Sequence, residues 1–337
     1  MIGLIGTEHT KRTDYFLRAA QSYNSDVQLF EWTEVFAEFE QVKEKLGQAA
    51  IKIDPPSYQI IKLLEMKGQL EQYKICLNKL DTAAEVFLNT PAAIQFVLDK
   101  RKTKQILHRQ NILTTELFLD KLLSAKQLVE QMQERKIYNV FIKPSEFSGA
   151  AGVMAFRIHP KTSALKLYTA CQMTSQGLFN TKKLSCIEDK DSIIKILDQL
   201  VKMDAMVERW HAKETIFGKS YDLRVVFQFG KIAHIVVRCS DGPITNLHLN
   251  NQAAQFSSLC LDNKKIEEIE VLCAKACHAI PGLQVAGLDV MLDKGSKTPR
   301  IIEINGQGDL IYQDIFAENK IYRQQIEYLK AQYHKVE

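Results

Sequence analysis

Two spacings of hydrophobic residues alternate along the first ninety residues of the chain. Short apolar runs suit buried strands: IGLIG, VQLFEW and AAIKI. Segments with helical spacing follow them: TDYFLRAAQSY, EVFAEFEQVKEKL and SYQIIKLLEMKGQLEQYKICLNKL. Strands that alternate with helices favour a parallel sheet with helices on its faces. The pattern therefore predicts a small parallel α/β domain at the start of the chain.

The pattern changes beyond this domain. Residues 91–110 have helical spacing throughout, and three strands are predicted after them, over NVFIKP, GVMAFRI and LKLYTACQM. Two long hairpins come later, YDLRVVFQFGKIAHIVVR and VAGLDVMLDKGSKTPRIIEIN, with a helix between them. The fold class is therefore α/β (α+β). The predicted parts are residues 1–90, 91–210 and 211–337.

Composition narrows the class of protein. Hydrophobic residues make up 46% and charged residues 25% of the 337 positions, as in ordinary globular proteins. Basic residues number 44 against 40 acidic ones, a balance too even to predict a nucleic-acid or membrane partner. The chain has no apolar run of bilayer length, no secretory signal pattern, and seven scattered cysteines without a C-x-x-C pair. We expect a cytoplasmic protein.

The second hairpin places acidic side chains opposite one another. Its turn, DKGSKTP, centres on Ser296, and Asp289 and Glu303 each lie seven residues from that centre. With this register the two carboxylates face each other on neighbouring strands, and Asn305 shares their face because side chains alternate with a period of two. A divalent cation would remove the repulsion, and three oxygen ligands suit Mg²⁺ or Mn²⁺ better than zinc. The alternative is a pair of solvated strand residues in a slipped register.

A loop of small residues lies between two predicted strands. In VFIKPSEFSGAAGV the first strand ends near Lys143, and Ser148, Gly149 and Gly152 belong to the loop that follows. Small residues let backbone N–H groups approach anionic oxygens, and a lysine adds a positive charge. The segment predicts a phosphate-binding loop, with an ordinary hairpin turn as the alternative.

The first hairpin carries arginines. Asp222 and Arg224 share a face of one strand, and Arg238 lies on the returning strand. Arginines beside a metal site can clamp a phosphoryl group that is being transferred. The alternative is ion pairing across the strands between Asp222 and an arginine.

Taken in order, these segments resemble the landmarks of the ATP-grasp superfamily, most nearly its RimK-like carboxylate–amine ligases. The similarity spans about residues 95 to 320, and its strongest piece is GLDVM followed by IIEIN, which resembles the family's metal-binding pair. The other matching segments are LDKRKTKQIL (first lysine), VFIKPSEFSGAAGV (second lysine and loop), AMVERW (adenine hinge) and YDLRVVFQFGKIA (D-x-R hairpin).

The resemblance implies a two-lobed ATP-grasp fold after the N-terminal domain, and it assigns roles residue by residue. The implied residues are Lys100, Lys143, Ser148, Gly149, Gly152, Val207, Glu208 and Trp210 for ATP, Asp289, Glu303 and Asn305 for Mg²⁺ (or Mn²⁺), and Arg224 and Arg238 for the transferring phosphoryl group. The basic run KRKTK, which begins at Lys100, is interpreted as mostly a solvated helix face.

The implied activity is ligation. ATP would activate a substrate carboxylate as an acyl phosphate, which an amine of an amino acid or peptide then attacks; the expected partners are small-molecule or peptide substrates. The chain departs from the family where RCSDGPITNLHLNNQAA carries Asn250 and Asn251 in place of two glycines. Two alternatives therefore stay open: another ATP-grasp chemistry (a kinase, or a thiol or hydroxyl acceptor), and a non-catalytic nucleotide-binding module. The sequence leaves the oligomeric state open.

Overall fold

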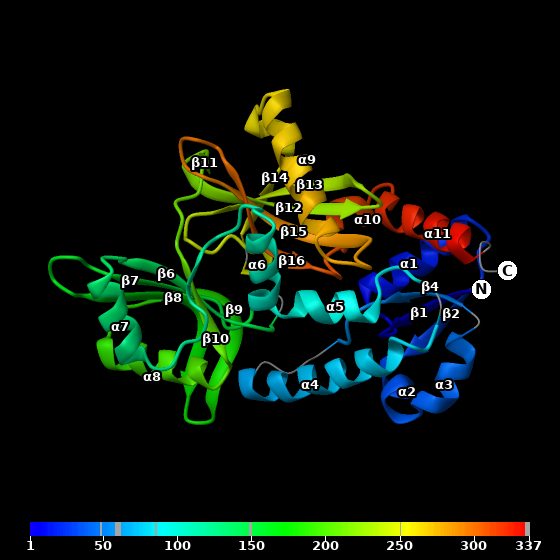
Figure 1. Ribbon diagram of the computed structural model, residues 1–337, viewed down its shortest axis with the longest axis horizontal. Coiled ribbons are helices and arrows are strands. Elements are labelled where there is room, and N and C mark those ends of the chain that lie inside the picture. Colours follow the sequence, from blue (N-terminus) through cyan, green and yellow to red (C-terminus); the bar gives the residue numbers. More distant parts are fainter. Residues whose placement is uncertain (48, 58–61, 85, 148–149, 250, 334–337) are drawn as a thin grey trace.

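Three β-sheets organise the chain in the computed structural model, and helices cover their faces (Figure 1). The N-terminal sheet, the lid sheet and the C-terminal sheet follow one another along the chain. The structure describes residues 1–47, 49–57, 62–84, 86–147, 150–249 and 251–333. Within these ranges, none of the helices combines the length and the apolar composition that crossing a membrane requires.

The N-terminal sheet has the strand order β2-β1-β3-β4, and all of its neighbouring strands are parallel, as predicted. Its two central strands are buried at every position, which explains why they are continuous apolar runs rather than alternating ones. The helix predicted over EVFAEFEQVKEKL is two helices, because the backbone leaves helical geometry at Glu38. The elements are β1 (Ile2–Gly6), α1 (Lys11–Ser22), β2 (Val27–Glu31), α2 (Trp32–Ala37), α3 (Phe39–Leu46), β3 (Ala50–Ile53), α4 (Leu63–Leu80) and β4 (Val86–Phe87).

The lid sheet is antiparallel, with the order β5-β10-β6-β7-β8-β9. The three predicted strands are present, but the sequence reading missed β9, whose side chains are mostly exposed or half-buried and so lack an apolar pattern. The elements are β5 (Leu117–Leu119), α7 (Ala125–Glu134), β6 (Asn139–Pro144), β7 (Met154–Ile158), β8 (Leu165–Thr174), β9 (Gly177–Ile187), α8 (Lys190–Val201) and β10 (Ala205–Arg209).

The C-terminal sheet contains both predicted hairpins. Its order is β14-β13-β12-β15-β16, with β11 paired to β12. The helix predicted over residues 91–110 breaks at Asp99, whose side chain caps the second half by accepting from the N–H groups of Arg101 and Lys102. The elements are α5 (Pro91–Leu98), α6 (Lys100–Arg109), β11 (Thr215–Ile216), β12 (Lys219–Gln228), β13 (Lys231–Ser240), β14 (Gln252–Ala254), α9 (Asn263–His278), β15 (Val285–Leu292), β16 (Pro299–Asn305), α10 (Tyr312–Ile315) and α11 (Lys320–Tyr333), with short 3-10 turns at Leu247–Leu249 and Phe256–Leu259.

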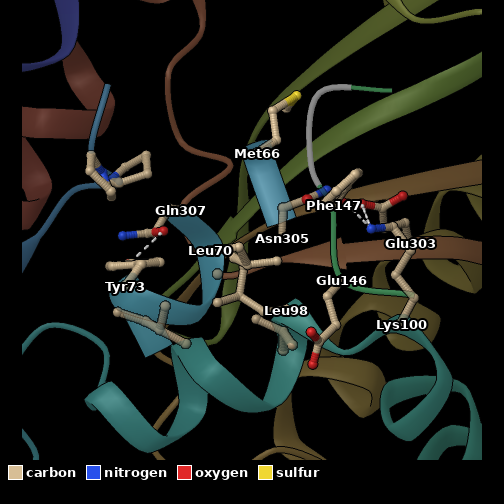
Figure 2. Close-up of a pocket in the computed structure, with 15 residues that line it drawn as sticks. Met66, Leu70, Tyr73, Leu98, Lys100, Glu146, Phe147, Glu303, Asn305 and Gln307 are labelled. Carbon is tan, nitrogen blue, oxygen red and sulfur yellow. Dashed lines mark hydrogen bonds and ion pairs between the residues drawn. The ribbon is translucent and has the colours of Figure 1, made fainter. Parts of the chain in front are cut away.

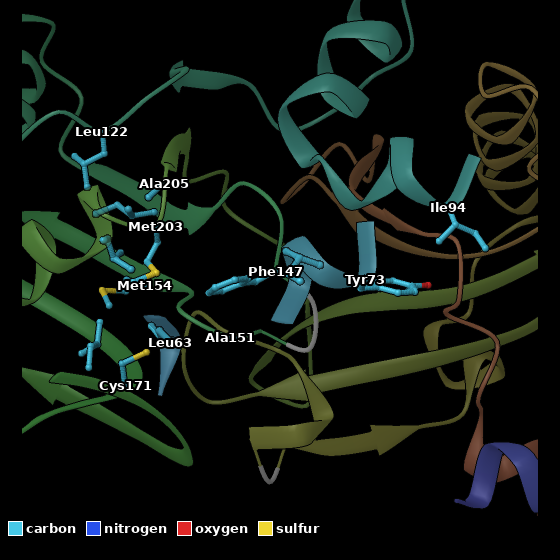
Figure 3. Packing of buried hydrophobic residues seen from close by; sticks show 14 of the residues in the cluster. Leu63, Tyr73, Ile94, Leu122, Phe147, Ala151, Met154, Cys171, Met203 and Ala205 are labelled. Atoms are coloured by element: carbon cyan, nitrogen blue, oxygen red, sulfur yellow. The ribbon is translucent and has the colours of Figure 1, made fainter. Parts of the chain in front are cut away.

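Two helices tie the N-terminal sheet to the rest of the molecule. The helix α11 packs on α1, β3 and β4. At the other end α4 reaches the lid, where Leu63 is fully buried in a hydrophobic core shared with β6, β7 and β8. Figure 3 shows Phe147 of the β6–β7 loop between the lid side chains and Tyr73 of α4. The lid and the C-terminal sheet are thereby held beside a common N-terminal support.

Candidate active site

The acidic pair of the last hairpin lies as predicted. Asp289 on β15 pairs directly with Glu303 on β16, and Asn305 pairs with Gly287, two residues further along. The register shifts only beyond Asp289, towards the turn. Gly287 is required here, because a Cβ atom at that position would come within 2.6 Å of the backbone Cα atom of Gly308. The hairpin therefore brings two carboxylates and an amide to one face of the sheet.

Two arginines hold the Asp289 carboxylate. Arg224 Nε lies 3.1 Å from Oδ1, and Arg238 Nη2 lies 3.1 Å from Oδ2. Arg238 also donates from Nε to Asp222 at 2.7 Å, and the Lys213 ammonium donates to the same carboxylate at 2.9 Å. We call these five side chains the cationic face. The predicted pairing of Asp222 across the strands is thus present, and it aligns Arg238 for Asp289 as well.

Charge compensation keeps the cationic face ionised. Burial works to raise the pKa of Asp222, but Arg238 and Lys213 outweigh it and hold that pKa well below its usual range. Burial likewise opposes the charge of Arg238, yet Asp222 and Asp289 raise its pKa. For Arg224 burial dominates and lowers the pKa. The face therefore carries three cations against two carboxylates.

A second buried cluster centres on Glu208 of β10. Its carboxylate, 1% exposed, accepts from Lys143 at 3.0 Å and from Thr115 at 2.8 Å, and Lys104 lies 3.5 Å away. Burial lowers the pKa of Lys104 to about 8, although Glu208 counteracts it. The interpretation of KRKTK as solvated beyond Lys100 is therefore wrong for Lys104, which points inward and is only 5% exposed.

Lys100 connects the metal face to the β6–β7 loop. Its ammonium lies 3.6 Å from Glu303 Oε1 and donates to the carbonyl of Phe147. Lys100 is buried, and its two contacts show that it lies where the hairpin, α6 and the β6–β7 loop converge.

A cavity of about 720 Å³, the central cavity, gathers six of the thirteen predicted site residues between the lid sheet and the C-terminal sheet. Lys100 lines a neighbouring cavity, and Ser148 and Gly149 lie outside the described residues. Among the residues that line the central cavity are Lys143, Arg224, Arg238, Asp289, Glu303 and Asn305.

The remaining predicted residues lie around this cavity rather than in its wall. Val207 is fully buried in the lid core, and Trp210 packs on Phe141 with ring centroids 5.2 Å apart. Glu208 contacts two residues of the cavity wall, Lys143 and Thr115. Gly152 has a positive φ and packs against Pro144, close to where a Cβ would clash. Their roles towards ATP stay predictions.

Sequence reasoning missed several residues of the central cavity wall. They are Thr115, Arg209, His211, Lys213 and Thr245. They come from different strands and loops, so no sequence spacing connects them. Arg209 and His211 are next to the predicted hinge residue Trp210, and this proximity could have pointed to them.

The loop with the family departure borders the same cavity. Asn251 donates from its amide to the carbonyls of Ile244 and Asn246, at 2.8 and 2.9 Å, and Asn246 lines the cavity wall. An asparagine side chain therefore closes this loop, whereas Asn250 lies outside the described residues.

The hairpin residues fit a magnesium ion. Asp289 Oδ1 is buried yet accepts no hydrogen bond within the described residues, although Arg224 is close. With its amide turned to suit both neighbours, Asn305 donates to Glu303 at 3.1 Å and accepts from Arg224 at 3.3 Å. Within the described ranges no three histidine, cysteine or acidic side chains are placed so that they could hold a metal ion together, so the third oxygen here would come from Asn305. Such an all-oxygen set is what Mg²⁺ prefers.

Comparisons with known proteins agree on the fold. The family described as YheC/D-like ATP-grasp matches residues 89–331. D-alanine–D-alanine ligase from Bacillus anthracis, solved with ATP, is similar over 99% of this chain and 97% of its own, with a TM-score of 0.58 and 14% identity. D-cycloserine synthetase DcsG is similar over 100% of this chain and 99% of its own, with a TM-score of 0.62 and 12% identity. The macrocyclase MdnC of Microcystis aeruginosa MRC, solved with its precursor peptide MdnA, is similar over 98% of this chain and 99% of its own, with a TM-score of 0.58 and 11% identity. No curated protein matches the sequence.

Proposed function

The chain belongs to the YheC/D-like ATP-grasp family and is thus an ATP-grasp enzyme, and on that premise we propose that it joins a substrate carboxylate to an amine with ATP and Mg²⁺. The resemblance to the ATP-grasp superfamily is confirmed, while the RimK-like subtype stays a prediction. The observation that carries the proposal is the opposed Asp289–Glu303 pair, which is bracketed by Arg224, Arg238 and Lys100.

The central cavity suits the triphosphate of ATP. Five basic side chains line it (Lys143, Arg209, Lys213, Arg224 and Arg238) against three carboxylates, which leaves a surplus of two positive charges. A polyanion is attracted to such a site, and low solvent access strengthens each interaction. We place the nucleotide there with its phosphates towards the hairpin.

A second cavity, the arginine cavity, supports binding of the acid substrate. It measures about 1190 Å³ and shares Arg224, Arg238 and Asn305 with the central cavity. Arg12 from α1 lines its far side, and its described lining residues include no carboxylate. A substrate carboxylate held by these arginines would lie beside the end of the triphosphate.

The reaction then needs positioning and charge neutralisation rather than a protein nucleophile. A substrate carboxylate oxygen bonds to the γ-phosphorus as the bond to ADP breaks. The amine nitrogen next bonds to the acyl carbon, and phosphate leaves with the electrons of its C–O bond while the amine loses a proton. Arg224 and Lys143 offset the negative charge of the phosphoryl oxygens. Bound Mg²⁺, held by Asp289, Glu303 and Asn305, would supply further charge neutralisation.

Product analysis tests the proposal. Purified protein with Mg²⁺ and ATP is offered a panel of carboxylic acids and amines, and a ligase yields ADP, phosphate and an amide. Glu303→Gln should lower this turnover by roughly 10²- to 10³-fold, as the loss of one preorganised electrostatic group does. The matched control is Glu130→Gln, because Glu130 is 61% exposed and pairs with the exposed Lys126 on the same helix, away from the cavity residues.

Other outcomes identify the alternatives. Phosphate retained on the product indicates a kinase, and Mg·ATP binding without turnover across the panel indicates a nucleotide-binding module. Full activity of Glu303→Gln with Mg²⁺ would show that the metal assignment is wrong.

A further inference from the structure

A third cavity, the apolar cavity, shares Glu303 and Asn305 with the central cavity and is also lined by Lys100. Its volume is about 920 Å³, which includes space open to solvent. Figure 2 shows Met66 and Leu70 of α4, Leu98 at the end of α5 and Phe147 of the β6–β7 loop around it. Further apolar lining residues are Pro55, Pro56, Ile94 and Val97.

Polar side chains gather at one end of the apolar cavity. Glu303 and Lys100 stand there, and Glu146 is nearby, held by Lys74 at 2.8 Å. Gln307 is fixed as well, since it donates to the carbonyl of Ile53 at 2.8 Å and accepts from Tyr73 at 3.2 Å. The cavity therefore has an apolar interior, a polar end beside the hairpin, and walls that are already in place.

The apolar and arginine cavities meet but differ in charge. Both are lined by Pro55, Asn305 and Gln307, so a group in one lies next to a group in the other. The arginine cavity has three cations and no carboxylate among its described lining residues, whereas the apolar cavity has two carboxylates and one lysine. Because Lys74 also pairs with Glu146, the surroundings of the apolar cavity are balanced in charge. The arginine cavity would therefore draw the acid, which leaves the apolar cavity to the amine, and their reactive ends would meet near Asn305.

We propose that the apolar cavity binds the apolar side chain of the amine substrate, so that the enzyme takes amines with aliphatic or aromatic side chains. The inference rests on the proposed ligase function and adds the class of the acceptor to it. The ammonium group would face Glu303 and Glu146, while the side chain contacts Leu70, Val97 and Phe147. Burial of a leucine-sized side chain gives a large preference over hydrogen, because each buried methylene contributes favourably.

Binding of simple amines tests this without turnover. L-Leucinamide, L-phenylalaninamide and glycinamide are titrated into the full chain by calorimetry, with Mg·ADP present at saturation so that the nucleotide site is filled. We expect Kd for leucinamide and phenylalaninamide to be at least about tenfold lower than for glycinamide. Equal affinities, or displacement of leucinamide by Mg·ADP, would overturn the proposal.

Filling the cavity provides the matched comparison. Leu70→Trp and Met66→Trp introduce bulk into the interior, whereas Leu64→Trp changes the same helix where the side chain is 53% exposed. Leucinamide binding should weaken at least about tenfold in a cavity variant and stay unchanged in Leu64→Trp. Leu70 is buried, so a tryptophan there could prevent folding, and the melting temperature of each variant is measured in parallel. If Leu70→Trp does not fold, Met66→Trp replaces it in the test, because Met66 is only half-buried.

Failure of the inference is distinguishable from failure of the function. If wild-type protein makes amides from small polar amines but binds leucinamide no better than glycinamide, the ligase function stands and the apolar cavity is not the acceptor site. If no amide forms from any pair while leucinamide still binds selectively, the cavity assignment stands and the proposed reaction is wrong.

Discussion

Besides the cationic face, the structure holds a second cluster of charged side chains where the N-terminal unit meets the segment after β16. Asp309 accepts from Arg12 through one oxygen, and its other oxygen lies 3.3 Å from Lys52 and accepts from Gln325 at 3.1 Å. Lys52 also pairs with Asp54. We call these five side chains the interdomain network.

The two clusters differ in balance and in access. The interdomain network has two cations against two carboxylates, and Lys52, Asp54 and Asp309 expose 3% or less of their side chains. The cationic face has a surplus cation, and its members line two cavities. Basic side chains lie beside both oxygens of Asp309 and both oxygens of Asp289, so the two clusters do not differ in this respect. Balanced, buried pairs fix how domains assemble, while surplus positive charge in a cavity wall leaves capacity for an anionic ligand.

The largest effect is expected from breaking the interdomain network. Asp309→Asn leaves Arg12 and Lys52 buried with only Asp54 for charge compensation, so the free energy of unfolding should fall by about 3–5 kcal/mol. Urea denaturation measures it. Asp241→Asn is the control, because that side chain is 82% exposed and its pair with Lys219 contributes little. A loss below about 1 kcal/mol in Asp309→Asn would mean that the network does not hold the domains together.

Nucleotide binding should separate the two clusters. At 100 times its Kd, a non-hydrolysable Mg·ATP analogue should raise the free energy of unfolding by about 2.7 kcal/mol. The analogue should raise the free energy of unfolding of Asp309→Asn by the same amount, although this variant is less stable than wild type. Lys143→Met should lose at least about 1.4 kcal/mol of it at the same concentration, because a tenfold weaker Kd follows from losing one phosphate contact. Calorimetric scans with and without the analogue measure the increment in each variant. Lys126→Met is the control, because the Lys126 side chain is 86% exposed. Equal increments in wild type and Lys143→Met would show that Lys143 does not belong to the nucleotide site.

The sequence predicted the cationic face better than the interdomain network. The prediction that Asp289 lies opposite Glu303 is confirmed, but the turn alone does not set this register, because the pairs next to the turn are offset by one residue and a bulge beside Asp289 restores the predicted pairing. Lys52 and Asp309 belong to different domains, and nothing in local spacing shows that they meet. Their burial depends on how α11 docks on β3, which is a tertiary fact.

The same limit explains the wrong or missing elements. The strand β9 escaped notice because its exposed edge carries polar residues, and Lys104 was read as solvated because a basic run gives no sign of which lysine faces Glu208. The lining of the apolar cavity draws on α4, α5 and the β6–β7 loop, so its apolar residues read in the sequence only as ordinary core positions.

Acid titration should show the smallest effect, and its sign follows from the pKa shifts. Burial works to raise the pKa of Asp309, but Lys52 and Arg12 outweigh it and hold that pKa well below its usual range. Below the ordinary aspartate pKa of about 3.9 the unfolded chain therefore binds more protons than the native protein, and stability is lost as pH falls. Asp54 acts with the opposite sign and at higher pH, because burial raises its pKa and the native protein therefore binds this proton before the unfolded chain does as pH falls. In Asp309→Asn the free energy of unfolding should therefore fall less steeply below pH 4, by up to about 1.4 kcal/mol per pH unit. Urea titrations at each pH measure it, and the control Asp241→Asn should run parallel to wild type. Parallel curves for all three proteins would mean that Asp309 is not held ionised by the interdomain network.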